Sequence, residues 1–481
     1  MFPPPFLSCV SIDFLFITLF LLQYHQEIIL RVSTLTNLGV GICRTTEDII
    51  IQSKENPEEE PNIISNWVVM VPNVIPGELV KLKIYRNMKT YSEADLVEVI
   101  EPSPNRVESK CPLFQKCGGC QYQHIDIQTQ REWKQEQVQD LLERVGGLDP
   151  STFPPVLHTL GTKEIYHYRS KITPHYNAPK NQKFISAIGF KEKSSRRIVD
   201  VPKCYIATHA INHKLTELRE QKQTECKEGT LRRPKKGATL LLRDVDTGVV
   251  TDNNEYVETT VALKTNSDDE RLKFRFLAGN FFQNNPYMLS VMVEQVVKAA
   301  TKPAADETEM THLIDCYCGS GLFCLSTSKY FQQCAGIEVN AKAVDEACMN
   351  AELNNIQNCA FVAASAEAIF ESDEAVVNRA APKEESNSDS SSLYVRDFPR
   401  KSTVVVVDPP RKGCSEEFLD QLYKFMPQRV VYMSCDPATQ ARDAKGLVEN
   451  GYEIVSAQPF DLFPQTRHIE SLVTFERKTD R

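Results

Sequence analysis

The sequence has no excess of basic residues: 55 lysines and arginines stand against 64 aspartates and glutamates, giving a formal net charge of −9. This balance argues against a protein that attracts nucleic acid through its overall charge. A local basic face is still possible, because the stretch from Tyr168 to Arg197 includes Arg169, Lys171, Lys183, Lys191, Lys193, Arg196 and Arg197. Such a run is more often only a solvated surface.

Disulfide-based folding is also disfavoured. The 15 cysteines are odd in number and unevenly spaced, and they occur in a chain of 481 residues rather than in a small secreted scaffold. We therefore expect them to be reduced, with some of them binding metal. The hydrophobic fraction of 41% and the charged fraction of 25% are typical of a soluble protein, and this length predicts roughly three domains.

The N-terminus is unusually apolar from Phe6 to Leu22, although Asp13 interrupts the stretch and no lysine or arginine precedes Arg31. It can be an organelle-targeting leader, a membrane anchor or a wrongly predicted start. We favour a leader or a wrong start for residues 1–30. A leader would indicate a plastid or a mitochondrion, and otherwise the expected location is the cytoplasm.

Between residues 31 and 103 the sequence is typical of a small antiparallel β-barrel. Short apolar stretches at 38–42, 67–72, 75–85 and 94–100 are separated by glycine, proline and polar residues. Regular short strands with such turns indicate a barrel. The region resembles the TRAM domain, an oligonucleotide-binding-type barrel, which implies a part in gripping RNA. A structural barrel without a ligand is the alternative.

Residues 104–280 are predicted to form a central α+β domain that opens with a cysteine-rich segment. A helix follows, in which Trp133, Gln137, Leu141 and Val145 recur every four residues before Gly146. The rest mixes short strands with basic loops and shows no recognisable catalytic motif. From 281 to 481, apolar strands alternate with helices, which predicts a Rossmann-like, doubly wound α/β domain. The acidic, serine-rich stretch 381–392 is expected to be a disordered loop.

A glycine turn in the last domain is the predicted cofactor site. From His312 to Phe323, HLIDCYCGSGLF runs from an apolar strand through Gly319 into a helix, and nucleotide-like ligands lie at such turns. Glu338 ends a second strand about twenty residues later, where it can accept hydrogen bonds from a ribose diol. A third strand ends at Ser365. Because no P-loop lysine accompanies the turn, S-adenosylmethionine fits better than ATP or a dinucleotide, and hydride transfer is the alternative.

Two further strands end in chemically useful side chains. STVVVVDPPRKG ends an apolar strand at Asp408, and the two prolines after it rigidify the turn. Amine methyltransferases carry an aromatic residue after the prolines, whereas this chain has Arg411. RVVYMS then brings Cys435 to the carboxyl end of the next strand. A cysteine is most often inert and buried, but this position favours a nucleophile.

Methylation of uracil at C5 would need such a nucleophile. Because C5 is itself a poor nucleophile, a thiolate must first attack C6 to form an enolate. A base, for which a carboxylate is suitable, must then remove the proton from C5. Glu470, at the edge of the final strand with His468 on the same face, is the candidate, although most glutamates at such positions are only solvated.

Together these stretches resemble the RNA uracil-C5 methyltransferases. SCDPATQARD, DLFPQTRHIES, DPPRKG and DCYCGSG carry the resemblance, which covers most of the chain from about residue 31. It implies that Cys435 is the nucleophile and Glu470 the base. It also implies that the S-adenosylmethionine and target-base pocket is lined by Gln283 of FFQNN, Tyr317, Gly319, Glu338, Ser365 and Asp408. Ser365 and Leu322 depart from the residues common in the family, which weakens those two contacts.

The segment CPLFQKCGGC contains Cys111, Cys117 and Cys120, a density that favours metal over a disulfide in a reduced protein. Cys204 is the candidate fourth ligand, because Cys226 lies in a charged stretch expected to be exposed. Spacing alone does not distinguish zinc from iron. The resemblance to the branch that modifies large-subunit ribosomal RNA implies a [4Fe-4S] cluster with a structural or RNA-orienting role.

The sequence thus predicts an enzyme that methylates C5 of a uridine flipped out of a single-stranded or looped RNA, with ribosomal RNA favoured over transfer RNA. A monomer without a stable protein partner is expected. A cytosine-C5 methyltransferase, the first alternative, would carry a cysteine where Pro409 and Pro410 stand. The second alternative is a non-catalytic RNA-binding assembly factor, which loss of Cys435 or Glu470 would favour, and both are present. Neither the RNA nor the uridine can be named from the sequence.

Overall fold

The computed structural model describes residues 22–45, 49–51, 62–64, 66–179, 184–193, 195–232, 238–264, 269–304, 307–368, 370 and 395–478. The loop expected at 381–392 and most of the expected leader lie outside these ranges. Contacts divide the chain into two compact units, Met1–Arg106 and Val107–Arg481. Within the described ranges, no helix is both long and apolar enough to span a membrane.

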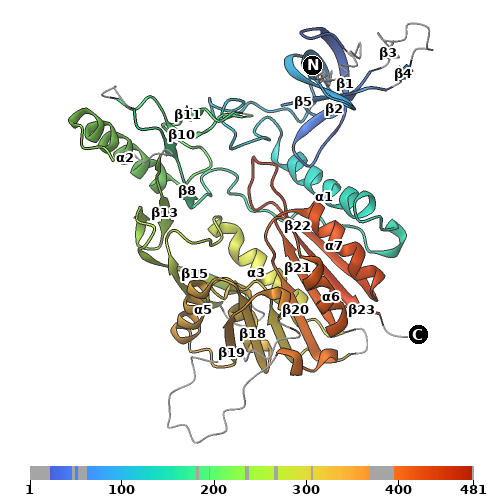
Figure 1. Cartoon of the computed structure of the whole chain (residues 1–481), viewed down its shortest axis with the longest axis vertical. Helices are drawn as coiled ribbons and strands as arrows, with labels where there is room; N and C mark the ends of the chain where they lie inside the picture. The colour runs from blue at the N-terminus through green and yellow to red at the C-terminus, as the bar shows by residue number, and fades with distance from the viewer. Residues whose placement is uncertain are drawn as a thin grey trace, which may run out of the picture. The chain divides into compact units, whose positions relative to one another are not determined.

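The first unit contains a closed barrel with the strand order β1-β2-β5-β7-β6 (Figure 1). Its strands are β1 (Glu27–Leu35), β2 (Val40–Arg44), β5 (Val68–Pro72), β6 (Leu79–Asn87) and β7 (Tyr91–Glu101), and β3 (Ile49–Ile51) pairs separately with β4 (Asn62–Ile64). In β6 every second residue, Val80, Leu82 and Ile84, is fully buried, as expected for a strand with one face on a core. The predicted barrel is confirmed, but it is not fully antiparallel, because β5 and β7 pair in parallel.

The barrel begins earlier in the chain than predicted. β1 starts at Glu27, within the stretch assigned to a leader, and pairs with both β2 and β6. Leu30 and Val32 are buried while Ile29 is 56% exposed, which is the alternation of a half-buried strand. The apolar stretch directly before it conceals this period of two in the sequence.

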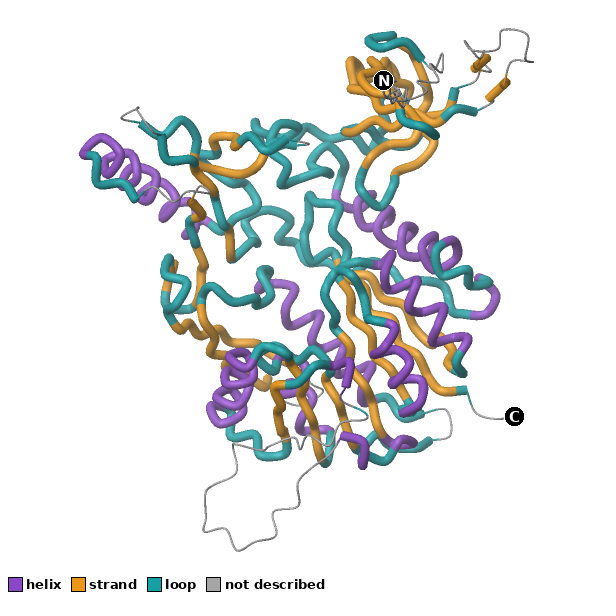
Figure 2. The backbone as a smooth tube through the Cα atoms, in the orientation of Figure 1, coloured by secondary structure: helices purple, strands orange, loops and turns teal. Residues whose placement is uncertain are grey.

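The predicted helix of the second unit is α1 (Ile127–Arg144), but its buried face differs from the prediction. Val138 and Leu142 are buried in the core, whereas Val145 is 47% exposed. A spacing of four residues drifts around a helix that has 3.6 residues per turn. Gln137 of the predicted face is therefore still buried and Leu141 packs against the core, but the face has turned away from the core by Val145. Figure 2 shows that loops and turns form much of the chain around this helix.

Short antiparallel sheets follow, with the orders β11-β10-β9-β12, β14-β13-β8 and β15-β16. The elements are β8 (Lys171–Ile172), β9 (His175–Tyr176), β10 (Ile188–Lys191), β11 (Ile198–Asp200), α2 (His209–Glu228), β12 (Ala238–Thr239), β13 (Leu242–Val245), β14 (Gly248–Val250), β15 (Tyr256–Lys264) and β16 (Asp269–Leu277). Ile211 and Leu215 of α2 pack with Leu242 of β13 in a small core of their own.

The C-terminal part contains a larger sheet with the order β19-β18-β17-β20-β21-β23-β22 (Figure 1). Its strands are β17 (His312–Asp315), β18 (Gln333–Glu338), β19 (Cys359–Ala363), β20 (Thr403–Val407), β21 (Arg429–Ser434), β22 (Tyr452–Phe460) and β23 (Glu470–Arg477). Neighbouring strands are parallel from β19 to β21, whereas β23 runs antiparallel to both β21 and β22. The predicted Rossmann-like sheet is confirmed.

Helices cover both faces of this sheet. They are α3 (Pro286–Thr301), α4 (Leu322–Thr327), α5 (Ala341–Leu353), α6 (Glu416–Phe425) and α7 (Pro437–Glu449). Val404 and Val406 of β20 join the core with α3 and α5, while Val405 and Val407 join the core with α1, α6 and α7. Figure 1 shows α6 and α7 side by side over one face. A run of four valines is thus explained by burial on both faces.

Candidate active site

The predicted site residues of this sheet meet at one of its edges. Tyr317 and Gly319 follow β17, Glu338 ends β18, Ser365 follows β19, Asp408 follows β20 and Cys435 follows β21. The carboxyl ends of parallel strands share an edge, and β23 runs in the opposite direction, so its first residue, Glu470, lies at this same edge. Ser434 pairs with Ser471 across β21 and β23. Cys435 and Glu470 therefore stand at neighbouring strand ends.

The turn after β17 leaves backbone open to a ligand. Gly319 and Gly321 have positive φ angles of 54° and 91°, which glycine adopts without strain. Among the described residues, no atom lies within 4 Å of the position that a Cβ on Gly319 would take. The Glu338 carboxylate holds the turn by accepting hydrogen bonds from the N–H groups of Gly319 (3.2 Å) and Asn340 (2.8 Å).

Asp315, the last residue of β17, was not singled out from the sequence. It is fully buried, and its Oδ2 accepts a hydrogen bond from the Cys324 N–H at 3.1 Å. Its Oδ1 has no partner within the described part of the chain. Burial, helped by the charge of Asp408, raises the pKa of Asp315 to about 8. A buried carboxyl oxygen without a partner is typical of a ligand site, and the signal for it was a charged residue at the end of an apolar strand.

Tyr317 and Ser365 differ in how firmly they are held. The half-buried Tyr317 ring packs edge-on against Phe418, with 5.7 Å between ring centroids. Ser365 is exposed and donates a hydrogen bond to Glu367. The weaker expectation for Ser365 agrees with this exposed position.

Gln283 is half-buried in the loop between β16 and α3, away from the strand ends in sequence. Two residues later, the buried Asn285 side chain donates a hydrogen bond to the Leu462 carbonyl oxygen at 2.8 Å. The FFQNN segment therefore lies against the loop that leads to Glu470. This contact brings Gln283 near the sheet edge that carries the other predicted residues.

Cys435 lies between the end of β21 and the N-terminus of α7, where a helix favours a negative charge. Burial and the charges of Glu470 and Asp408 raise the pKa of its thiol to about 11, so the resting group is neutral. Arg411 opposes these effects, because it hydrogen-bonds the thiol and its charge favours the thiolate. Arg411 is a second site residue whose positive role the sequence analysis missed.

Glu470 is buried, with 6% of its surface exposed, and not solvated as such glutamates usually are. Burial and the charge of Asp408 raise its pKa well above the usual range, while Arg411 opposes the shift. Burial also raises the pKa of Asp408 to about 7. Carboxyl groups with raised pKa values can exchange protons near neutral pH, as acid–base catalysis requires.

His468 precedes β23 instead of sharing a face of that strand with Glu470. Burial and the nearby charges of Arg411 and Arg467 lower its pKa to about 4, so the imidazole is neutral at neutral pH. Its ring lies edge-on to Phe463, with centroids 6.1 Å apart, and the Arg169 guanidinium lies 5.5 Å from the centroid of the same ring. Arg169 of the predicted basic run therefore contacts the loop that leads to Glu470, and the hydroxyl of the neighbouring Tyr168 donates a hydrogen bond to the Pro464 carbonyl oxygen at 2.9 Å.

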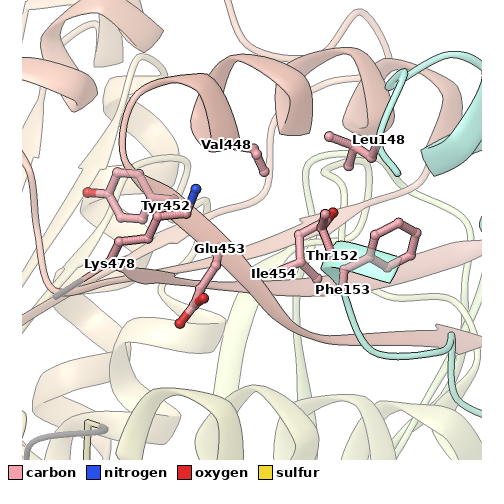
Figure 3. A pocket seen from close by; sticks show the side chains of 8 residues that line it. All are labelled: Leu148, Thr152, Phe153, Val448, Tyr452, Glu453, Ile454 and Lys478. Atoms are coloured by element: carbon pink, nitrogen blue, oxygen red, sulfur yellow. The ribbon is translucent and has the colours of Figure 1, made fainter. Parts of the chain in front are cut away.

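A pocket elsewhere in the second unit is not this site. Figure 3 shows its lining residues, Leu148, Thr152, Phe153, Val448, Tyr452, Glu453, Ile454 and Lys478. Tyr452 begins β22, whereas Phe460 at the other end of that strand pairs with Glu470. A strand of nine residues spans roughly 30 Å, so the pocket lies at the opposite edge of the sheet.

The four cysteines predicted to bind metal are neighbours. Cys111, Cys117 and Cys120 share one loop, and Cys204 lies within electrostatic range of them. Burial is the main cause of the raised pKa of each thiol. In the part of the chain that is described, no three histidine, cysteine or acidic side chains converge to hold a single metal ion. Cys226, expected to be exposed, is instead buried in α2.

The sequence profile of the tRNA (uracil-5-)-methyltransferases matches residues 167–478, which is more than half of the chain. The chain belongs to this family. It is an RNA (uracil-C5-)-methyltransferase, as the resemblance predicted. The matched residues include every residue predicted to be catalytic or to bind the cofactor, whereas α1 and three of the four clustered cysteines precede the match.

Two relatives in this tRNA (uracil-5-)-methyltransferase family are similar to nearly the whole chain. The tRNA (uracil(54)-C(5))-methyltransferase of Schizosaccharomyces pombe is 36% identical over 464 residues, which cover 95% of this chain and 79% of that protein. The enzyme of the same name from Saccharomyces cerevisiae is 30% identical over 516 residues, covering 95% and 74%. Both are named for transfer RNA, so the predicted preference for the ribosomal RNA branch is not supported.

The fold also resembles a solved structure, the Pyrococcus abyssi tRNA (uracil-54, C5)-methyltransferase in complex with S-adenosyl-L-homocysteine. The TM-score is 0.59 at 20% sequence identity, and the match covers 94% of this chain and all of that one. This likeness supports the fold of the tRNA (uracil-5-)-methyltransferase family for the chain.

Proposed function

We propose that the protein transfers the methyl group of S-adenosylmethionine to C5 of a uridine in transfer RNA, with Cys435 as nucleophile and Glu470 as base. One observation carries the proposal. A thiol and a buried carboxyl group stand at neighbouring strand ends, beside an open glycine turn, in a chain of the tRNA (uracil-5-)-methyltransferase family.

The reaction begins at Cys435. Its thiolate sulfur adds to C6 of uracil, and the electron pair of the C5=C6 bond moves into an enolate that makes C5 nucleophilic. S-Adenosylmethionine supplies a methyl group on a positively charged sulfur. C5 bonds to the methyl carbon as the bond between that carbon and the sulfonium sulfur breaks, which leaves S-adenosylhomocysteine. Glu470 then removes the proton from C5. The C5=C6 bond then re-forms as the C6–S bond breaks, which returns the thiolate.

Neighbouring residues prepare each step. Arg411 stabilises the thiolate, because it is the cation that hydrogen-bonds the Cys435 sulfur. The raised pKa of Glu470 makes it a stronger base, once ionised, than an exposed carboxylate. Asp408 has a pKa of about 7, and its charge contributes to the raised pKa of Glu470. All three side chains act close to the sulfur that must form and break one bond.

The acidic strand ends suit S-adenosylmethionine, whose amino and sulfonium groups are cationic. Asp315 offers a buried oxygen without a partner among the described residues, and Glu338 ends the second strand, as expected for a ribose-binding acid. The glycine turn leaves room for a ligand against the backbone. Tyr317, Ser365 and Gln283 complete the proposed binding set. We propose that these residues hold the cofactor.

The RNA target has its own test. Cells that lack the protein are expected to lose 5-methyluridine at position 54 of transfer RNA, because the relatives at 36% and 30% identity are named for that reaction. Mass spectrometry of nucleosides from purified transfer RNA and ribosomal RNA measures the loss. The wild-type gene should restore the modification, whereas a Cys435→Ala gene should not. Loss from ribosomal RNA with transfer RNA unchanged would contradict the proposed target.

The four clustered cysteines offer four thiols, the number that a [4Fe-4S] cluster binds. In a [4Fe-4S] cluster each thiolate binds a different iron, so the four sulfurs surround a volume and do not converge on one point. Cys111, Cys117, Cys120 and Cys204 are mutual neighbours. We propose that these four side chains hold a [4Fe-4S] cluster in a structural role.

Protein purified without oxygen should therefore be brown and contain about four irons and four sulfides per chain. Cys117→Ser should lose the colour and most of the iron. Cys226→Ala, which removes a buried cysteine outside the group, should keep both. Elemental analysis measures the iron and sulfide content, and the visible spectrum measures the colour. A colourless sample that contains zinc would refute an iron cluster.

A further inference from the structure

The loop from Asp461 to Ile469, here called the catalytic loop, joins β22 to β23 and leads directly into Glu470. It has no regular secondary structure, yet Asp461, Gln465 and Thr466 are all buried. Gln465 also has a left-handed backbone, with φ of +69°, which a residue other than glycine adopts only when its surroundings hold it there. The conformation of this loop must therefore be imposed by its neighbours.

The main neighbour is Gln130, a fully buried residue in the first turn of α1. Its Oε1 accepts a hydrogen bond from the Gln465 N–H at 3.0 Å, and its Nε2 donates to the Gln465 Oε1 at 3.1 Å. The same Nε2 also donates to the carbonyl oxygens of Tyr122 (3.1 Å) and Ile125 (2.8 Å). One amide thus joins the catalytic loop to the segment before α1.

Other bonds from the same segment hold the loop at further points. The N–H groups of Gln121 and Tyr122 both donate to the Gln465 carbonyl oxygen, at 3.1 and 3.0 Å. At the start of the loop, Lys134 of α1 pairs with Asp461 at 2.5 Å, and both side chains are fully buried. The left-handed residue is therefore bonded through its N–H, its carbonyl oxygen and its side chain.

The two halves of α1 make different kinds of contact. Its C-terminal half packs apolar side chains such as Val138 and Leu142 on the core, whereas its N-terminal half presents Gln130 and Lys134 to the loop. Buried polar networks define one conformation more than they add stability. The N-terminal half of α1 is therefore suited to fix the position of the catalytic loop and of Glu470 at its end.

We propose that Gln130 is a positioning residue for the base step, acting through Gln465 on the catalytic loop that ends at Glu470. The inference rests on the proposed function, in which Glu470 removes the proton from C5. Gln130 touches no reacting atom; it keeps the loop in the conformation from which Glu470 reaches the C5 proton. Formation of the Cys435 adduct depends on β21 and α7 and should be independent of it.

Two assays separate the steps. RNA containing 5-fluorouridine forms an adduct that cannot lose its fluorine, so the rate of covalent complex formation reports only the steps up to methyl transfer. With ordinary RNA, release of the methylated product also requires the base. Gln130→Ala should change complex formation less than threefold but slow release by about tenfold to a hundredfold, the effect of a small misplacement. A covalent complex with ordinary RNA should then accumulate.

Gln130→Met keeps the volume and helix propensity of the side chain but removes its hydrogen bonds. It should also slow product release while changing complex formation little. Gln128→Ala is the matched control, because Gln128 is exposed on the same turn and its side-chain amide donates a hydrogen bond to the exposed Glu132. It should behave as wild type. Equal slowing of both steps in the Gln130 variants, or a defect in Gln130→Ala that Gln130→Met lacks, would overturn the positioning role. Failure of the wild type to form any adduct would overturn the proposed function itself.

Discussion

Replacing Cys435 with alanine is expected to abolish covalent complex formation with 5-fluorouridine RNA and to lower methylation by roughly 10⁴-fold or more, the scale seen when a catalytic nucleophile is removed. Without the sulfur, nothing adds to C6 and C5 stays a poor nucleophile. The fold should be retained, because the half-buried side chain belongs to neither core of the α/β sheet. Denaturing gel electrophoresis with labelled RNA, together with a methyl-transfer assay, measures both effects.

Cys348→Ala provides the control for this experiment. Cys348 lies in α5, is 7% exposed and belongs to the sheet core, so its loss should affect stability without affecting the adduct. Methylation by this variant should stay within a few-fold of wild type at a temperature where it is folded. A covalent complex that persists in Cys435→Ala would assign the attack to another residue.

Most strands of the α/β sheet could be predicted, because each is an apolar run that ends at a recognisable residue; β22 was not predicted. Val404–Val407 is a run of apolar residues that only burial on both faces explains, and a single acid, Asp408, closes it. Since parallel strands share a carboxyl edge, strand ends that are far apart in sequence could be expected to meet. The glycine turn and Cys435 are predictable for the same reason.

Burial of polar side chains could not be predicted in this way. Lys134 is fully buried against Asp461, and Gln130 bonds a residue 335 positions away, yet both read as the solvent face of a polar helix. The raised pKa of Glu470 likewise depends on how the loop and the neighbouring strands exclude water. Periodicity records which residues are apolar, not which polar groups find partners in the folded chain.

The RNA target could not be predicted from the sequence for a different reason. In the proposed mechanism Cys435, Glu470 and Asp408 define the chemistry at uracil C5, and that chemistry is the same in any RNA that presents the base. The selection of a target resides in surfaces that no short motif marks. The preference for ribosomal RNA came from the cysteine segment alone, and relatives matching 95% of the chain, both named for transfer RNA, outweigh it.

Replacing Glu470 with glutamine is expected to leave adduct formation near its wild-type rate and to slow product release by about 10²- to 10⁴-fold, the usual contribution of a general base. The amide has nearly the shape of the carboxyl group but cannot take up the C5 proton. A covalent complex should therefore accumulate even with ordinary RNA, which the wild-type enzyme releases. Glu453→Gln, an exposed residue of β22, is the matched control and should release product normally.

The pH dependence gives an independent check on Glu470. A base acts in its ionised form, and burial raises the pKa of Glu470 well above the usual range for a carboxyl group. The release rate of the wild type should therefore still rise with pH where an exposed glutamate would already be fully ionised. In Glu470→Gln this rise should disappear, while the pH dependence of adduct formation, which follows the Cys435 thiol, should remain. A release rate that keeps its rise with pH in the glutamine variant would assign the base to another group, and Asp408, with a pKa of about 7, would be the next carboxyl group to test.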